Sequence, residues 1–390
     1  MEVSVLIVAA EASADQHAAE VVRRLAARPG APRFFGVAGP ALRAEGVEVV
    51  ARTEELSVMG IGDVVVALPR ILGIVRRLLG EVRRRRPAAA LLIDSPDLNL
   101  RLARKLHRRG VKVLYYIGPT LWAWRSGRAK TIRRFVDRML VIFPFEQEIY
   151  EKLGVAATYV GNPLLDARSE DEGLRASEAE QREALGLPAG GRVVALLPGS
   201  RRGEIQRCFP TLLEAARRLA GRDEELSFVV PLAPTLERAF VQTFIDAHAP
   251  GLRLRLVEVP ARRVLAVADA AAVVSGTATL EAALEDTPMV VVYRFGWLAW
   301  KVAGVLVDVP HWSLVNLIAE AGLVPERFQD DATPEAIAAD LEAILPGGAR
   351  HAELREGLAE VRRRLGAPGA AERVADALAE LIPPSGESPS

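Results

Sequence analysis

Short apolar segments alternate with longer amphipathic segments along most of the chain. The apolar segments run for about five residues with few polar positions, a pattern typical of parallel strands that are buried on both faces. Strands are expected at 3–9, 34–38, 89–93, 111–117, 139–143, 158–160, 193–197, 228–231, 252–257, 270–274 and 289–293, and helices at 13–26, 68–85, 98–109, 129–135, 146–153, 205–220, 236–248, 261–268 and 278–285. The alternation predicts an α/β fold with parallel sheets between layers of helices.

The alternation lapses after Pro163 and restarts near residue 191, which predicts two domains. Residues 1–166 and 191–350 each contain enough strands for a Rossmann-like, doubly wound sheet, and the charged stretch 167–190 is expected to be a linker with a surface helix. Only helices are expected from 334 to 382, and those from about 350 can pack back on the first domain. The tail, 383–390, is rich in Pro and Ser and is predicted to be disordered. A cleft between the domains is the expected ligand site.

Composition excludes several classes of function. Lys+Arg and Asp+Glu both number 50, so no global positive charge favours nucleic acid. Cys208 is the only cysteine and the histidines lack ligand spacing, so neither a disulfide nor a metal site is expected. The N-terminus lacks a basic leader, and no long uncharged apolar stretch occurs, so we expect neither a signal peptide nor a membrane span.

Two polar turns in the second half follow predicted strands and precede predicted helices. Free N–H groups and hydroxyls at such turns suit a phosphate. One turn contains Ser275, Gly276, Thr277, Ala278 and Thr279, with Glu281 one helical turn later; the other contains Gly199, Ser200 and Arg201, followed by Glu204. Glu281 is placed to accept hydrogen bonds from a ribose diol. Together the turns indicate a nucleoside diphosphate site, and the alternative is two ordinary strand-to-helix connections.

Acidic residues follow two predicted strands of the first half. Asp97 directly precedes a predicted helix and fits its N-cap, which leaves Asp94 free to take a proton from an attacking alcohol. Glu11 stands at the end of the first strand, with helix capping as its alternative role, and Asp15 is expected to be a first-turn acid and not a catalyst. For Asp94 the alternative is an acceptor that orders the loop.

Two further segments have aromatic or apolar residues beside arginines. Trp122, Trp124 and Arg125 can stack on a sugar or an acyl chain and approach a phosphate, although core packing is the alternative. Met59, Ile71 and Ile74 belong to an apolar stretch followed by arginines, and this combination suits an anionic membrane surface. A plain amphipathic helix packed on its sheet explains the same pattern.

These motifs, in this order, resemble those of the lipid-A-disaccharide synthase family, glycosyltransferase family 19. The resemblance rests on AAEAS at 9–13, GVAGP at 36–40, VMGI at 58–61, IDSPD at 93–97, WAWR at 122–125, PFE at 144–146, LLPGSR at 196–201, SGTATLE at 275–281, and PMVV at 288–291 before Tyr293 and Arg294. It implies a GT-B fold and an inverting, metal-independent and cofactor-free transfer from UDP-2,3-diacylglucosamine to 2,3-diacylglucosamine 1-phosphate. It also implies a cytoplasmic protein, peripheral on the inner membrane, because both substrates carry acyl chains.

The resemblance also implies roles for single residues. Asp94 would be the base on the acceptor hydroxyl, with Glu11 in the same cleft; Arg201 and the 275–279 turn would hold the diphosphate and Glu281 the ribose. Asn316, in SLVNL at 313–317, matches an asparagine that the family needs. The chain departs from the family pattern at Ala10, Ala14, Asn162, Val315 and Glu320-Ala321. Two alternatives therefore remain: another UDP-sugar enzyme of this fold, such as a UDP-GlcNAc 2-epimerase, and a non-catalytic nucleotide-sugar binder. Acyl-chain selectivity and oligomeric state do not follow from the sequence.

Overall fold

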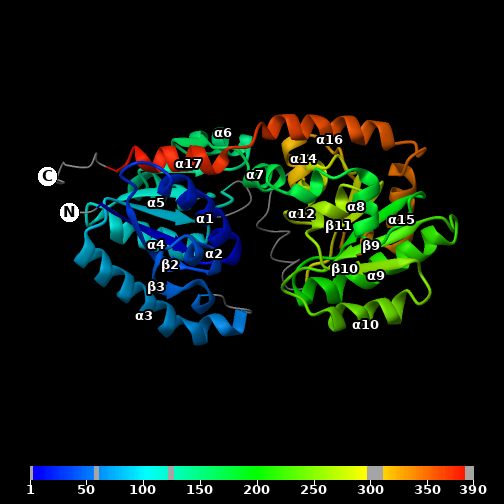
Figure 1. Cartoon of the computed structure of the whole chain (residues 1–390), viewed down its shortest axis with the longest axis horizontal. Coiled ribbons are helices and arrows are strands. Elements are labelled where there is room, and N and C mark those ends of the chain that lie inside the picture. Colours follow the sequence, from blue (N-terminus) through cyan, green and yellow to red (C-terminus); the bar gives the residue numbers. More distant parts are fainter. Residues whose placement is uncertain (1–2, 57–60, 122–126, 297–310, 383–390) are drawn as a thin grey trace. The chain divides into compact units, whose positions relative to one another are not determined.

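The chain folds into two compact units. The computed structural model describes residues 3–56, 61–121, 127–296 and 311–382, and for 61–67 it describes the main chain alone. Unit 1 comprises Met1–Asp166 and Ala367–Ser390, and unit 2 comprises Ala167–Gly366 (Figure 1). The chain therefore crosses from one unit to the other twice.

Unit 1 is built on a seven-stranded parallel sheet in the order β3-β2-β1-β4-β5-β6-β7. The strands are β1 (Ser4–Ala9), β2 (Arg33–Ala38), β3 (Glu48–Arg52), β4 (Ala89–Ile93), β5 (Lys112–Tyr116), β6 (Arg138–Val141) and β7 (Ala157–Tyr159). The order reverses direction between β1 and β4, and open α/β sheets bind ligands at the carboxyl ends of strands at such a switch point.

Helices cover both faces of this sheet, so its central strands are apolar on both sides. The helices are α1 (Ala12–Ala26), α2 (Pro40–Ala44), α3 (Ile61–Arg85), α4 (Pro96–His107), α5 (Arg128–Phe135) and α6 (Pro144–Lys152), with a 3₁₀ turn at Thr53–Glu55. Helix α7 (Pro163–Ser169) carries the chain from unit 1 into unit 2, with the boundary after Asp166. Helix α3 begins seven residues before the expected start at Leu68, and its interior Pro69 does not end it.

The last helix, α17 (Ala370–Ala379), packs on unit 1 although it lies at the far end of the sequence (Figure 1). Its apolar residues Val374 and Leu378 join the core on the α1 face of the sheet. The carboxylate of Asp166 accepts hydrogen bonds from the first N–H groups of this helix, those of Gly369 (2.5 Å), Ala370 (3.2 Å) and Ala371 (2.9 Å). The Asp166 carboxylate thus accepts hydrogen bonds from N–H groups that have no partner within the helix, and its negative charge offsets the positive end of the helix dipole.

Unit 2 repeats the architecture with a six-stranded parallel sheet, in the order β10-β9-β8-β11-β12-β13. Its strands are β8 (Val193–Leu197), β9 (Ser227–Pro231), β10 (Leu254–Val257), β11 (Ala270–Val274), β12 (Met289–Tyr293) and β13 (Glu326–Phe328). Its helices are α8 (Glu178–Ala184), α9 (Arg202–Ala220), α10 (Arg238–His248), α11 (Ala261–Leu265), α12 (Ala278–Leu284), α14 (Leu314–Ala319), α15 (Pro334–Ile344) and α16 (His351–Leu365), with 3₁₀ turns at Glu172–Leu174 and Gln329–Asp331. The switch point lies between β8 and β11.

The segment 167–190, expected to be a linker, belongs to unit 2. The buried carboxylate of Asp171 forms ion pairs with Arg262 (2.5 Å) and Arg263 (2.7 Å), both in the first turn of α11. These two arginines hold the pKa of Asp171 below its usual value against the effect of burial. The segment is therefore anchored to the second unit and is not a free connection.

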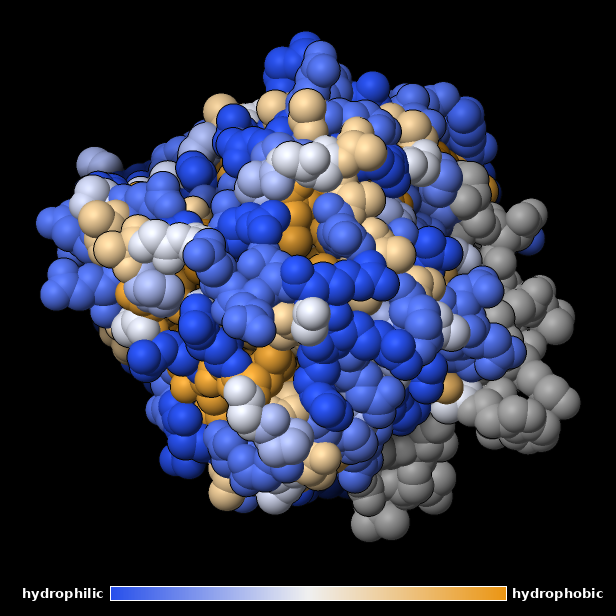
Figure 2. Space-filling view, turned by 90° about the vertical axis from the view of Figure 1, so that its right-hand side faces the viewer, coloured by the Kyte–Doolittle hydropathy of each residue, from blue (hydrophilic) through white to orange (hydrophobic). Residues whose placement is uncertain are grey.

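Figure 2 shows one face of the molecule, on which hydrophilic residues predominate and apolar residues form scattered patches. Within the described ranges, no helix has the length and apolar character needed to cross a bilayer.

Candidate functional site

The turns predicted to carry chemistry lie at the switch point of each sheet. In unit 1, β1 and β4 are neighbours, with Ala9 opposite Ile93, so the turns that follow them lie side by side. These turns contain Glu11 and Asp94, and the Ser95 hydroxyl donates a hydrogen bond of 3.3 Å to the Glu11 carboxylate. Glu11 occupies the N-cap position of α1, but its side chain forms no capping hydrogen bond there. Glu11 therefore faces the Asp94 turn and does not cap its own helix.

Asp94 is held in an unusual backbone conformation at the end of β4. Its φ of 50° and the φ of 43° at Ser95 are both left-handed, which for residues other than glycine costs on the order of 1–3 kcal/mol each. Burial raises the pKa of the Asp94 carboxyl, the nearby Glu11 charge raises it further, and a hydrogen bond from the Ser95 main chain opposes both effects. A carboxylate with a raised pKa is a stronger base, so this environment suits proton abstraction.

The neighbouring acids of unit 1 have structural roles. Helix α4 starts at Pro96, so Ser95 and not Asp97 is at the N-cap position, and the prediction for Asp97 was wrong. Asp97 lies in the first turn, and its carboxylate pairs with Arg128 at 2.6 Å. The side chain occupies the exposed side of the helix start, away from the main-chain donors that an N-cap satisfies.

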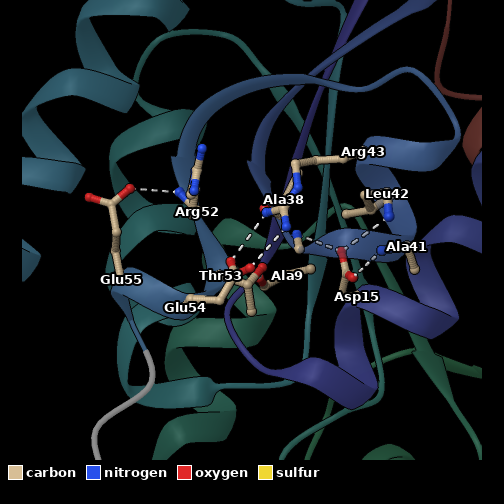
Figure 3. A network of polar contacts seen from close by, with 11 residues as sticks. Ala9, Asp15, Ala38, Ala41, Leu42, Arg43, Arg52, Thr53, Glu54 and Glu55 are labelled. Carbon is tan, nitrogen blue, oxygen red and sulfur yellow. Dashed lines mark hydrogen bonds and ion pairs between the residues drawn. The ribbon is translucent and has the colours of Figure 1, made fainter.

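Asp15 is buried and holds the turn between β2 and α2. Its carboxylate accepts hydrogen bonds from the N–H groups of Gly39 (2.6 Å), Ala41 (2.8 Å) and Leu42 (3.3 Å) (Figure 3). In the same network, the Thr53 hydroxyl donates to the main-chain oxygen of Ala9 at 2.7 Å. The Thr53 bond fixes the end of β1, two residues before Glu11, and the three bonds to Asp15 give its carboxylate a structural role.

In unit 2, the two polar turns line one cavity of about 880 Å³. Its walls come from the ends of β8, β9 and β11 and the segment before α11: Leu197, Pro198, Gly199, Ser200, Arg201, Glu204, Pro231, Leu232, Ala233, Pro234, Leu236, Arg238, Glu258, Val259, Pro260, Ala261, Val274, Ser275, Gly276, Thr277, Ala278 and Glu281. The volume suits a drug-sized or nucleotide-sized ligand.

The turn after β11 offers unpaired donors to this cavity. Among the described residues, no acceptor is found for the N–H groups of Gly276, Thr277 and Ala278, whereas the N–H of Ser275 is bonded to β12. Gly276 has a φ of 154°, a conformation that side chains disfavour, and open space surrounds its Cα. Thr279 is different: its buried hydroxyl donates to the Gly276 oxygen at 2.8 Å, so it shapes the turn and cannot contact a ligand.

The turn after β8 is already occupied by an internal anion. The Glu204 carboxylate accepts from the N–H groups of Ser200 (2.9 Å) and Arg201 (3.2 Å), and a Cβ on Gly199 would lie within 2.5 Å of it. This turn contributes the guanidinium of Arg201 to the cavity. The Arg201 side chain is 82% exposed. The predicted anion site thus combines the amides of one turn with the cation of the other.

Glu281 lines the cavity one turn into α12. Burial raises the pKa of its carboxyl, the positive charge of Arg262 lowers it, and the nearby Glu285 raises it again. A largely buried carboxylate that borders a cavity is suited to accept hydrogen bonds from ligand hydroxyls.

Asn316 does not reach this cavity. It is 1% exposed, and its amide donates to the Val324 oxygen (3.0 Å) and the Glu326 carboxylate (2.9 Å), while its amide oxygen accepts from the N–H of Val324 (2.9 Å). These bonds hold the segment between α14 and β13. The catalytic role of Asn316 stays a prediction. Asn162 is likewise buried, bonded to Ile142 and Leu164.

The predicted membrane residues divide into three groups. Trp122, Trp124, Arg125 and Met59 lie outside the described residues. Ile74 is 1% exposed in the core beneath α3, so it is not available to a membrane as predicted, whereas Ile71 is partly buried and packs against the same core. Among the α3 side chains that the structure describes, from Leu68 on, Leu68 and Leu72 are instead the large apolar residues that are exposed, each at 45%. Within the described ranges, no group of His, Cys, Asp and Glu is arranged to hold a metal ion.

Solved structures share this fold at low sequence identity. A UDP-GlcNAc 2-epimerase from Neisseria meningitidis bound to UDP-GlcNAc is similar, with a TM-score of 0.65, 14% identity, and coverage of 97% of this chain and 100% of that chain. The glycotransferase of kitacinnamycin has a TM-score of 0.64 and 19% identity, with coverage of 98% of each chain. These similarities confirm the predicted fold class, GT-B with two Rossmann-like parallel sheets.

The sequence comparisons identify the family. The family model described as lipid-A-disaccharide synthetase matches residues 5–379. A lipid-A-disaccharide synthase of Anaeromyxobacter dehalogenans is 50% identical over 95% of this chain and 96% of its own, and that of Myxococcus xanthus is 46% identical over 97% and 98%. The chain belongs to the lipid-A-disaccharide synthase family.

Proposed function

We propose that the protein is an inverting hexosyltransferase that joins UDP-2,3-diacylglucosamine to 2,3-diacylglucosamine 1-phosphate. The products are the β-1,6-linked lipid A disaccharide 1-phosphate and UDP. The observation that carries the proposal is the unit 2 cavity, where three consecutive unpaired N–H groups, Gly276 to Ala278, border the same space as Arg201 and Glu281. Amides and a cation suit a diphosphate, and the carboxylate suits a ribose.

The donor half of the mechanism follows from these groups. As the bond between C1 of the donor sugar and the diphosphate oxygen breaks, negative charge grows on UDP. The free N–H groups stabilise this charge without reorganising, because the fold already fixes their positions, and the exposed Arg201 guanidinium adds a positive charge beside them. The Ser275 and Thr277 hydroxyls border the same space and add donors.

In the acceptor half of the mechanism, Asp94 is the general base. A primary alcohol is a weak nucleophile, so the acceptor 6-hydroxyl must lose its proton as its oxygen bonds to C1. The Asp94 carboxylate takes that proton, and its raised pKa favours the transfer. Attack on the face of C1 opposite the leaving UDP inverts that carbon, and the proton on Asp94 passes to water after the product leaves.

Membrane association is proposed through α3. Leu68 and Leu72 are exposed one helical turn apart, and Arg70 and Arg76 on the same helix are exposed too. Apolar residues flanked by arginines suit the anionic cytoplasmic surface of the inner membrane, where diacylated substrates reside. In this proposal the protein is cytoplasmic and binds peripherally to the inner membrane.

The experiment that tests the function is incubation of the purified protein with both diacylated substrates, followed by analysis for UDP and disaccharide in equal amounts. A second candidate, a UDP-sugar 2-epimerase, is favoured by the structural similarity to the N. meningitidis epimerase. Epimerisation of UDP-GlcNAc without any disaccharide supports that candidate. Binding of UDP without either product supports a nucleotide-sugar binder.

A further inference from the structure

The turn that carries Asp94 adopts a conformation that its sequence does not favour. Asp94 and Ser95 are consecutive left-handed residues, and neither is glycine. Such a turn persists only where surrounding groups hold it in place. Its backbone direction also decides where the Asp94 carboxylate points, because the side chain and the carbonyl leave the same Cα.

Two buried side chains hold the Asp94 carbonyl from different elements. The Tyr115 hydroxyl, on β5, donates to the Asp94 oxygen at 2.6 Å, and the Asn99 amide, on α4, donates to the same oxygen at 2.9 Å. The Asn99 amide also donates to the Ile93 oxygen at 3.0 Å. Both side chains are fully buried. The turn is therefore fixed both by the helix that follows it and by the adjacent strand.

Simple satisfaction of a buried carbonyl does not require this arrangement. One donor is enough for a buried main-chain oxygen, and Asn99 already supplies it. The second donor is a tyrosine in the apolar core, where burial raises the pKa of its hydroxyl and keeps it protonated as a donor. Two donors on one oxygen restrict the direction of that carbonyl, and with it the rotation of the Asp94 backbone.

We propose that Tyr115 and Asn99 are positioning residues that aim the Asp94 carboxylate at the acceptor hydroxyl. The inference rests on the proposed function, in which Asp94 is the base. Neither residue touches substrate in this scheme; both act through the left-handed turn. A displacement of about 1 Å at a reacting group lowers turnover by up to about 100-fold.

The test is Tyr115→Phe, which removes one hydroxyl and keeps the ring that packs in the core. The expected result is a fall in kcat of about 10-fold with KM within about twofold of wild type, because substrate binding is untouched. Asn99→Leu removes both amide bonds and is expected to lower kcat further. The matched control is Tyr116→Phe, the same change at the next residue of β5, on the opposite face of the sheet and equally buried. Wild-type kcat in Tyr115→Phe, or an equal loss in Tyr116→Phe, overturns the proposal.

A second measurement keeps the inference separate from the proposed function. Carboxyl ¹³C NMR titration of Asp94 needs no substrate, and in Tyr115→Phe the pKa of Asp94 should fall towards its usual value as the loosened turn admits water. An Asp94 titration identical to wild type overturns the positioning role. If wild-type protein forms no disaccharide, the proposed function fails, and the titration alone decides the role of Tyr115.

Discussion

The two units have the same topology at their switch points but opposite chemistry there. In unit 1, the turns after β1 and β4 bring together two carboxylates, Glu11 and Asp94, and their mutual repulsion adds to burial in raising the pKa of Asp94. In unit 2, the turns after β8 and β11 bring together an arginine and free N–H groups. The first arrangement suits proton abstraction and the second suits an anionic ligand. Strand order thus fixes where a site lies, while a few side chains decide its charge.

The same contrast occurs within unit 2 on a smaller scale. Both turns present main-chain N–H groups, but those of Ser200 and Arg201 are taken by Glu204, whereas those from Gly276 to Ala278 have no acceptor in the described part of the chain. A carboxylate from the chain itself cancels one potential anion site. Asp15 and Asp166 do the same at α2 and α17. A polar turn before a helix is therefore a ligand site only where the protein supplies no internal anion.

The largest effect is expected from replacing Asp94, the proposed base in unit 1. Asp94→Asn should lower kcat by about 10³-fold, within the range for loss of a general base, and leave UDP affinity unchanged because unit 2 is untouched. Because the folded-state pKa of Asp94 is raised, its ionisation destabilises the fold as pH rises through that pKa. Asp94→Asn should therefore also unfold at a higher temperature than wild type at neutral pH. Steady-state kinetics and thermal melts check both, and substantial turnover in the variant excludes Asp94 as base.

The next largest effect is expected at the free N–H groups of the turn after β11, in unit 2. Thr277→Pro deletes one free N–H at a position whose φ of −58° a proline accepts, and it should weaken UDP binding by about 10- to 100-fold, as expected for a charge-assisted hydrogen bond. Thr277→Ala is the control, since it removes the hydroxyl and keeps the N–H. Isothermal titration with UDP measures both variants, and equal affinities would mean that the amide contributes nothing.

A smaller effect is expected from the Arg201 side chain. Arg201→Gln removes a highly exposed cation, so UDP affinity should fall by less than about 10-fold and the salt dependence of binding should decrease. The control is Arg202→Gln, which removes the neighbouring exposed arginine, paired with Glu237. A larger loss for Arg202 than for Arg201 contradicts the assignment.

The pH profile separates the two carboxylates of unit 1. Asp94 must be ionised to act as base, so kcat/KM should decline as pH falls through its raised pKa. Glu11→Gln removes a negative charge that raises this pKa, so the acidic limb should move to lower pH by less than about one unit. An unmoved limb would mean that Glu11 and Asp94 do not interact electrostatically.

The smallest effect concerns the exposed face of α3. Leu68→Gln with Leu72→Gln should reduce pelleting with anionic liposomes by about two- to fivefold, since each exposed leucine buries only part of its surface in a membrane. Val49→Gln, which alters an exposed apolar residue of β3 and not of α3, serves as control. Unchanged pelleting of the double variant argues against this contact. Acids at Ile71 and Ile74 would not test it, because both side chains pack in the core.

The local pattern of apolar and polar residues was sufficient to predict the central strands and the positions of the polar turns. The strands 89–93, 193–197, 270–274 and 289–293 have the predicted bounds because each is a continuous apolar run of only five residues, too short for a typical buried helix. Strands β3 and β13 were not predicted: β3 is a partly exposed edge strand and β13 has three residues, so neither has a clear apolar period.

The roles of single polar residues were harder to predict. The sequence singled out Asp94, Arg201 and Glu281, which lie at strand ends or helix starts that pattern alone can locate. Nothing local distinguishes Asn99 or Tyr115, since their partner, the Asp94 oxygen, is brought near by strand pairing and a left-handed turn. The structural bonds of Asn316 were not predictable for the same reason, because its partners at Val324 and Glu326 are brought near only by the fold.

The return of α17 to unit 1 has a consequence for biosynthesis. Residues 371–378 complete the core beside α1, yet the ribosome delivers them only after all of Ala167–Gly366. At about 5–20 residues per second, the apolar face of the nascent first unit stays uncovered for about 10–40 s. During that interval it is a ready substrate for chaperones, so the second unit should complete its fold before the first.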